Sequence, residues 1–221
     1  MQNTVEEIIL VSLSRTSFLA ELKSRDYLKF GNIAADWPAI VNECESAVKE
    51  FPQYWSSLVV DPKSFAWDKI GEEYAADLEK NRAWGYTPEN TRSWTTLATK
   101  PQLTMTWEEN IANQLPLTNW ISRPTMQTPG NVMPWHKDNF YYFKRNYPNL
   151  EFVIRFVIFM QDWQIGHVLQ AGDSIISHWK AGDVMVWHPE RMHLSANIGV
   201  TNKWTINTTG ILKEEYENTN T

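Results

Sequence analysis

The sequence has little cysteine, no excess of basic residues and no long apolar run, and each shortage excludes a class of protein. A single cysteine, Cys44, excludes an intramolecular disulfide. A formal net charge of −6 provides no basic footprint for a nucleic-acid backbone or an anionic membrane. No apolar run approaches the roughly 20 residues of a membrane span, and Glu6 and Glu7 stand where a secretory leader is basic. We therefore expect a cytoplasmic protein that binds neither nucleic acid nor membrane.

What the chain does contain is enough apolar material for one substantial core. With 221 residues, 43% of them hydrophobic, we expect a single domain over residues 1–221. The 12 tryptophans are scattered without a period, which indicates packing in the core and against sheets.

Residues 1–119 are predicted to be a mostly helical support, because caps and apolar stripes recur there. The clearest helix is predicted over Asp36–Phe51, with Asp36 as cap, Pro38 in the first turn and Pro52 as stop. Four other helices are expected. The first begins at a Thr4–Glu7 capping box, although a strand over Ile8–Val11 stays open, and the second covers Ser17–Lys29 and ends at Gly31. The third lies within Ser64–Lys80, and the fourth begins at a Thr106–Glu109 capping box and ends before Pro116.

From Trp120 the pattern changes to short β-rich runs separated by Gly, Pro and Asp. Eight strands are expected: Ile121–Gln127, Val132–Asp138, Phe152–Asp162, His167–Gln170, Ser174–Trp179, Val184–His188, His193–Ala196 and Lys203–Ile211. Such a series predicts a mainly β fold, a sandwich or jelly roll over residues 120–212. Ala-Gly-Asp at 171–173 and 181–183 is interpreted as two turns, and residues 213–221 as a flexible polar tail.

The motif His136-Lys137-Asp138 carries the candidate chemistry. On an extended strand, residues two apart point to the same side, so His136 and Asp138 offer an imidazole and a carboxylate to one point. With His193 from a later strand they would form the two-histidine, one-carboxylate triad that holds Fe(II), or inert Mn(II), with open positions. A hydrogen-bonded structural role for His136 stays open, and His188 is the rival third ligand.

Two cations accompany this set. Lys203 and Thr205 share one face of the last predicted strand, and the turn after His193 returns that strand towards it. Arg155 interrupts the apolar run F-V-I-R-F-V-I-F-M, and a buried guanidinium needs an anionic partner, either a ligand carboxylate or an internal ion pair. His167 and His178 have no carboxylate at metal spacing and are interpreted as structural.

At these residues the sequence resembles the Fe(II)- and 2-oxoglutarate-dependent oxygenases, which carry H-x-D, a distant His and, about ten residues later, a basic residue followed two on by a hydroxyl. Here those are His136, Asp138, His193, Lys203 and Thr205. The ordered set is most similar to small prolyl-hydroxylase-like and aspartyl/asparaginyl-hydroxylase-like members, including phage forms, and it covers residues 120–212.

The resemblance implies a double-stranded β-helix. It also implies metal ligation by His136, Asp138 and His193, and oxoglutarate binding by Lys203 and Thr205, with Arg155 as a second candidate. The implied reaction is hydroxylation of a peptide residue or small molecule using O2. The implied location is the cytoplasm, which includes that of a phage-infected bacterial host. The sequence departs from many prolyl-hydroxylase relatives because no tyrosine lies in Ile121–Trp135. The alternative is a catalytically inactive β-sandwich binding module; a cupin is disfavoured because its usual pair is H-x-H.

Overall fold

The structure is a computed structural model that describes residues 13–57, 78–96 and 103–216. Its helices are α1 (Arg15–Ser24), α2 (Trp37–Glu50), the 3-10 helix η1 (Pro52–Tyr54), α4 (Glu108–Ala112) and α5 (Tyr141–Asn146). Its strands are β1 (Leu13–Ser14), β2 (Leu28–Asn32), β3 (Trp55–Ser57), β4 (Arg92–Thr95), β5 (Leu117–Gln127), β6 (Asn131–His136), β7 (Val153–Phe159), β8 (His167–Ala171), β9 (Ser174–Ile176), β10 (Asp183–Val186), β11 (His193–Asn197), β12 (Lys203–Leu212) and β13 (Glu215–Tyr216).

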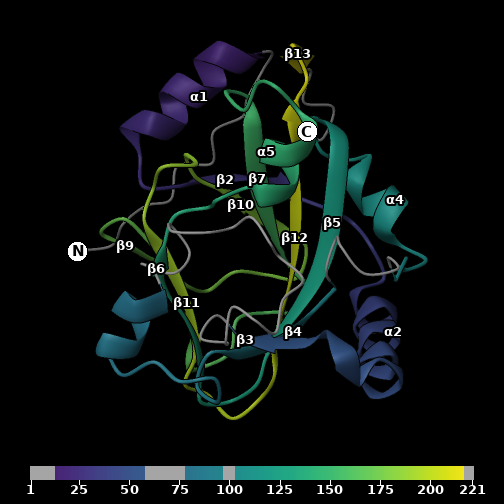
Figure 1. The fold of residues 1–221 in the computed structure, drawn as a ribbon. Coiled ribbons are helices and arrows are strands. Elements are labelled where there is room, and N and C mark those ends of the chain that lie inside the picture. The colour runs from purple at the N-terminus through teal and green to yellow at the C-terminus, as the bar shows by residue number, and fades with distance from the viewer. Residues whose placement is uncertain (1–12, 58–77, 97–102, 217–221) are drawn as a thin grey trace.

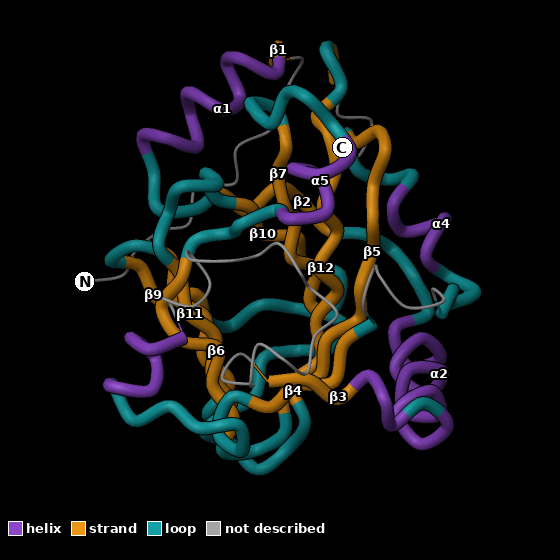
Figure 2. The backbone as a smooth tube through the Cα atoms, viewed as in Figure 1, coloured by secondary structure: helices purple, strands orange, loops and turns teal. Residues whose placement is uncertain are grey.

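Two antiparallel sheets face each other (Figures 1 and 2). The larger has seven strands in the order β2-β10-β7-β12-β5-β4-β3, and the smaller has four in the order β6-β11-β8-β9. The eight strands from β5 to β12 are the eight predicted from sequence, and their pairing is that of a double-stranded β-helix. The mainly β, jelly-roll core is therefore confirmed.

Alternation along the strands gives each face of the larger sheet its own core. Phe156, Ile158, Trp204 and Ile206 belong to a cluster that also contains Phe18 and Leu22 of α1 and Ile40, Cys44 and Ala47 of α2, so these helices cover the outer face. Val157, Phe159 and Met185 point to the opposite side and pack with Leu169, Ile176 and Trp179. The second cluster fills the space between the sheets, where Phe159 and Trp179 stack at 3.9 Å between ring centroids.

Helix α2 forms as expected, because Asp36 accepts a hydrogen bond from the Ala39 amide at 3.1 Å and Pro38 occupies the first turn. The prediction of a helix that begins with a capping box at Thr106 is wrong. Helix α4 begins at Glu108 without a side-chain cap, because Thr106 instead donates its hydroxyl to Glu43 on α2 at 2.6 Å.

The mostly helical N-terminal half is not confirmed, since β2, β3 and β4 from this half extend the larger sheet. The helix expected over Ser17–Lys29 ends at Ser24, and Leu28–Asn32 forms β2 because its backbone pairs with β10, about 150 residues along the chain. The Thr4–Glu7 box and most of the helix expected within Ser64–Lys80 lie outside the described residues; residues 78–83 are helical.

The two Ala-Gly-Asp segments are turns, as expected: Gly172 and Gly182 have φ of 52° and 89°. A flexible tail was predicted from residue 213, but the start of this segment is paired: Glu215–Tyr216 forms β13 and pairs with Leu13–Ser14 of β1. No helix within the described ranges is long and apolar enough to cross a bilayer.

Candidate metal centre

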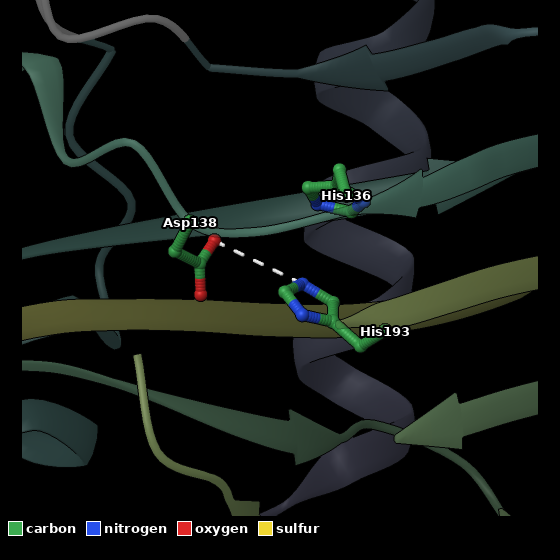
Figure 3. A group of neighbouring side chains, drawn as sticks. All are labelled: His136, Asp138 and His193. Carbon is green, nitrogen blue, oxygen red and sulfur yellow. Dashed lines mark ion pairs between the residues drawn. The ribbon is translucent and has the colours of Figure 1, made fainter. Parts of the chain in front are cut away.

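The fold brings His136, Asp138 and His193 together, as the sequence predicted (Figure 3). His136 ends β6 and His193 begins β11, and the two residues are directly paired across the smaller sheet. Asp138 follows His136 by two residues and points to the same place. One potential ligand atom from each residue lies within 4.8 Å of the others, which is the arrangement of a metal site.

Backbone carbonyls fix the orientation of both imidazoles. His136 Nδ1 lies 2.7 Å from the carbonyl oxygen of Pro134, and His193 Nδ1 lies 3.0 Å from that of Arg191. A carbonyl only accepts hydrogen bonds, so each Nδ1 carries the proton and each Nε2 carries the lone pair. This hydrogen bond behind the ring is the usual support of a metal-binding histidine.

The electrostatics of the group keep the His193 imidazole neutral. Burial, together with repulsion from His136, lowers the pKa of His193 to about 4, so the imidazole is neutral at pH 7. The Trp187 ring packs against it at 4.7 Å between centroids. His193 Nε2 lies 3.9 Å from Asp138 Oδ1, and the Asp138 side chain is buried.

Arg155 takes the second of its two predicted roles, the internal ion pair. Its Nη1 donates to Asp138 Oδ1, and its Nε donates to the Thr209 hydroxyl at 3.0 Å. Asp138 is thereby held in place by a guanidinium from the larger sheet.

Lys203 lies between the two sheets, only 2% exposed. Its Nζ donates to the Val168 carbonyl and, at 2.8 Å, to the Ser195 hydroxyl on β11, two residues from His193. No carboxylate in the described part of the chain forms an ion pair with it. Burial alone lowers the pKa of Lys203 to about 7, the mark of an ammonium without a counter-charge.

The inner face of the larger sheet continues as a polar row that the sequence reading missed in part. Thr205 and Asn207 follow Lys203 on β12, and Gln127, Thr125 and Arg123 face them across β5. Gln127 reaches the smaller sheet, accepting a hydrogen bond from the Ser195 hydroxyl at 2.6 Å. The signal for Arg123 was available: Arg123, Thr125 and Gln127 alternate as polar residues with the same period as Lys203, Thr205 and Asn207.

The remaining histidines lie outside the metal group. The His188 Nδ1 accepts a hydrogen bond from the Glu190 amide at 3.3 Å. The His167 Nε2 lies 3.2 Å from the Thr201 carbonyl, and His178 stacks on Trp163 at 4.6 Å between centroids. The geometry therefore favours His193 over His188 and gives the other two packing roles.

No protein-family model and no curated protein matches the chain by sequence. Among solved structures, the chain is similar to a non-haem alpha-ketoglutarate-dependent carbocyclase, SnoK, from nogalamycin biosynthesis, with a TM-score of 0.54 and 9% identity over 93% of this chain and 88% of that chain. It also matches a Pseudomonas putida prolyl-4-hydroxylase with a TM-score of 0.47 and 14% identity, over 93% of this chain and 100% of that chain. A non-haem monooxygenase, ThoJ, in a nickel complex has a TM-score of 0.47 and 13% identity, over 90% and 79% of the two chains. At such identities the likeness to the carbocyclase shows a common fold.

Proposed function

We propose that the protein is an Fe(II)- and 2-oxoglutarate-dependent oxygenase that hydroxylates an unactivated C–H bond of a peptide residue or small molecule. The observation that carries the proposal is the His136, Asp138 and His193 group with both Nδ1 atoms held by carbonyls. The fold common with a carbocyclase described as alpha-ketoglutarate-dependent supports it.

The residues present fit this metal. Two neutral imidazoles and one carboxylate are the ligand set of non-haem Fe(II) sites, and they leave adjacent positions for a bidentate 2-oxo acid and O2. When bound, iron and oxoglutarate supply the oxidising chemistry, in which oxoglutarate is converted to succinate and CO2. Arg155 holds Asp138 in the orientation that a ligand needs, and Trp187 shields His193 from water.

Lys203 is our candidate for the far carboxylate of oxoglutarate. A buried ammonium without an acid partner is costly, and a ligand carboxylate supplies the missing charge. The Thr205 hydroxyl lies on the same face, two residues along β12, where it can donate a second hydrogen bond. Arg155 is less suited to this role because Asp138 and Thr209 already occupy it.

A titration of the Fe(II)–oxoglutarate charge-transfer absorption under anaerobic conditions tests this assignment. Lys203→Ala removes a charge-assisted contact, so oxoglutarate affinity should fall roughly ten- to a hundredfold. Thr205→Val should weaken affinity less, since no charge is lost.

Arg155→Met is the matched control, because it removes a cation from the same sheet face. It should affect metal affinity, through Asp138, more than oxoglutarate affinity. A larger loss of oxoglutarate affinity in Arg155→Met than in Lys203→Ala would reverse the two roles.

A further inference from the structure

Among the described residues, Arg123 in the middle of β5 is a second cation of the inner face that has no anionic partner. Its direction is fixed by the sheet: Ser122 and Met126 point to the outer side, where Ser122 bonds Thr208 at 2.9 Å and Met126 joins the outer core. Arg123 and Gln127 therefore point the other way, towards the smaller sheet, which Gln127 reaches through Ser195.

Arg123 has no anionic partner in the part of the chain that the structure describes. In the described ranges no hydrogen bond or ion pair involves its guanidinium, although arginine carries five donors. Burial, with repulsion from Arg155, lowers its pKa to about 10, so it stays charged at neutral pH. A largely buried guanidinium without a partner is costly unless a ligand completes it.

Arg123 also lies close to the metal centre. It is near enough to Arg155 for the two guanidinium groups to repel, and Arg155 contacts Asp138 directly. Arg123 on β5 pairs with Asn207 on β12. Asn207 is two residues from Thr209, whose hydroxyl accepts a hydrogen bond from Arg155. Arg123 thus lies on the inner face of the larger sheet, near the arginine that holds Asp138.

Oxoglutarate does not account for both unpaired cations. Asn207 is the β12 residue opposite Arg123, and it lies four residues from Lys203 on the same strand. The Cα atoms of Lys203 and Asn207 are therefore roughly 13 Å apart. The far carboxylate of one oxoglutarate can neutralise Lys203 or Arg123, and Lys203 is the more deeply buried. Arg123 then remains available when metal and oxoglutarate are bound.

We propose that Arg123 binds a carboxylate of the primary substrate, so that the enzyme acts on a carboxylic acid. The planar guanidinium fork matches a carboxylate through two parallel hydrogen bonds, which would fix the orientation of the substrate beside the metal. This inference rests on the proposed function for its reaction, but the anion site itself is independent of it.

Calorimetric titration with matched probes tests the site. The probes are the free L-amino acids and short linear monocarboxylic acids, and each acid is compared with its own carboxamide. Each pair is titrated into the protein alone and into the protein with Mn(II) and oxoglutarate added. We expect at least one acid to bind about tenfold or more tightly than its amide. Arg123→Gln should bring that ratio close to one, and Arg123→Lys should retain part of it.

Arg92→Gln on β4 removes the same charge from an exposed strand position and should leave the ratio unchanged. The inference would be overturned if no acid were preferred over its amide, or if the preference survived Arg123→Gln while oxoglutarate is bound. A fall in oxoglutarate affinity in Arg123→Gln equal to that in Lys203→Ala would also overturn it.

The two proposals fail in different ways. If the wild type binds neither Mn(II) nor oxoglutarate but still prefers acids through Arg123, the anion site stands and the oxygenase proposal is wrong. If metal and oxoglutarate bind and Arg123→Gln changes no acid-to-amide ratio, the oxygenase proposal stands and the anion site is wrong.

Discussion

Oxoglutarate affinity should fall as pH rises above 7, because Lys203 must be charged to hold the far carboxylate. In the ligand-free protein, burial lowers the pKa of Lys203 to about 7. A bound carboxylate favours the ammonium, so the pKa of Lys203 rises in the complex and binding takes up a proton. The groups that contact the ammonium are the Val168 carbonyl, the Ser195 hydroxyl and the Trp179 ring, and none of them titrates in this range.

The magnitude follows from the protonated fraction. With a pKa of about 7, Lys203 is about half protonated at pH 7. Only about 3% is protonated at pH 8.5. Because losing the charge-assisted contact costs roughly ten- to a hundredfold, affinity should fall roughly four- to twelvefold over this interval and change little below pH 6. His193, with a pKa of about 4, stays neutral throughout, so its protonation does not interfere.

The assay is the anaerobic charge-transfer titration at several pH values, with iron saturating. Lys203→Arg is the control: a guanidinium stays protonated across the range, so the pH dependence should flatten even if affinity at pH 7 is lower. Equal oxoglutarate affinity at pH 7 and 8.5 in the wild type would refute the reasoning.

Further predictions concern the metal and stability. His136→Ala and His193→Ala should each abolish stoichiometric Fe(II) or Mn(II) binding in equilibrium dialysis, whereas His188→Gln should bind normally; the reverse pattern would make His188 the ligand. Burial raises the pKa of Glu108 to about 7, which means that the folded state favours the protonated carboxyl. The stability that this protonated form provides is lost as pH rises from about 4.5 to 7. Glu108→Gln should therefore be more stable than wild type by about 2–3 kcal/mol at pH 8 and little different at pH 4.5 in urea unfolding; equal stability at pH 8 would contradict this. Gly182→Ala should lose about 2 kcal/mol or more and lower Tm, since φ is +89° and a Cβ would lie 2.4 Å from the Ile33 carbonyl oxygen; an unchanged Tm would count against the turn.

The β core and the metal group were predictable because their signals are local. Alternation and turn residues mark each strand from β5 to β12, and the H-x-D spacing places His136 and Asp138 on one side. Strand β2 was not predictable, because Leu28–Asn32 becomes a strand only by pairing with β10. The Thr106 cap failed for a similar reason, since Glu43 competes for its hydroxyl.

The partners of the buried cations depend on tertiary contacts that no spacing encodes. The sequence left two roles open for Arg155, and the structure pairs it with Asp138. It indicated a cation at Lys203, but the burial of this lysine without an acidic partner among the described residues follows from the packing of the two sheets. Arg123 was missed because its alternation with Thr125 and Gln127 is ordinary for a strand, and its lack of an acidic partner among the described residues appears only in the folded protein.

The measurement that tests the oxygenase proposal most directly is succinate formation from oxoglutarate by the iron-loaded protein in air. With the carboxylic-acid panel present, we expect succinate to form in proportion to enzyme, to require both Fe(II) and O2, and to be lost in His193→Ala. Succinate formation that is no greater than in His193→Ala, for every member of the panel and for a parallel peptide panel, would contradict the proposal and favour a binding module without catalytic activity.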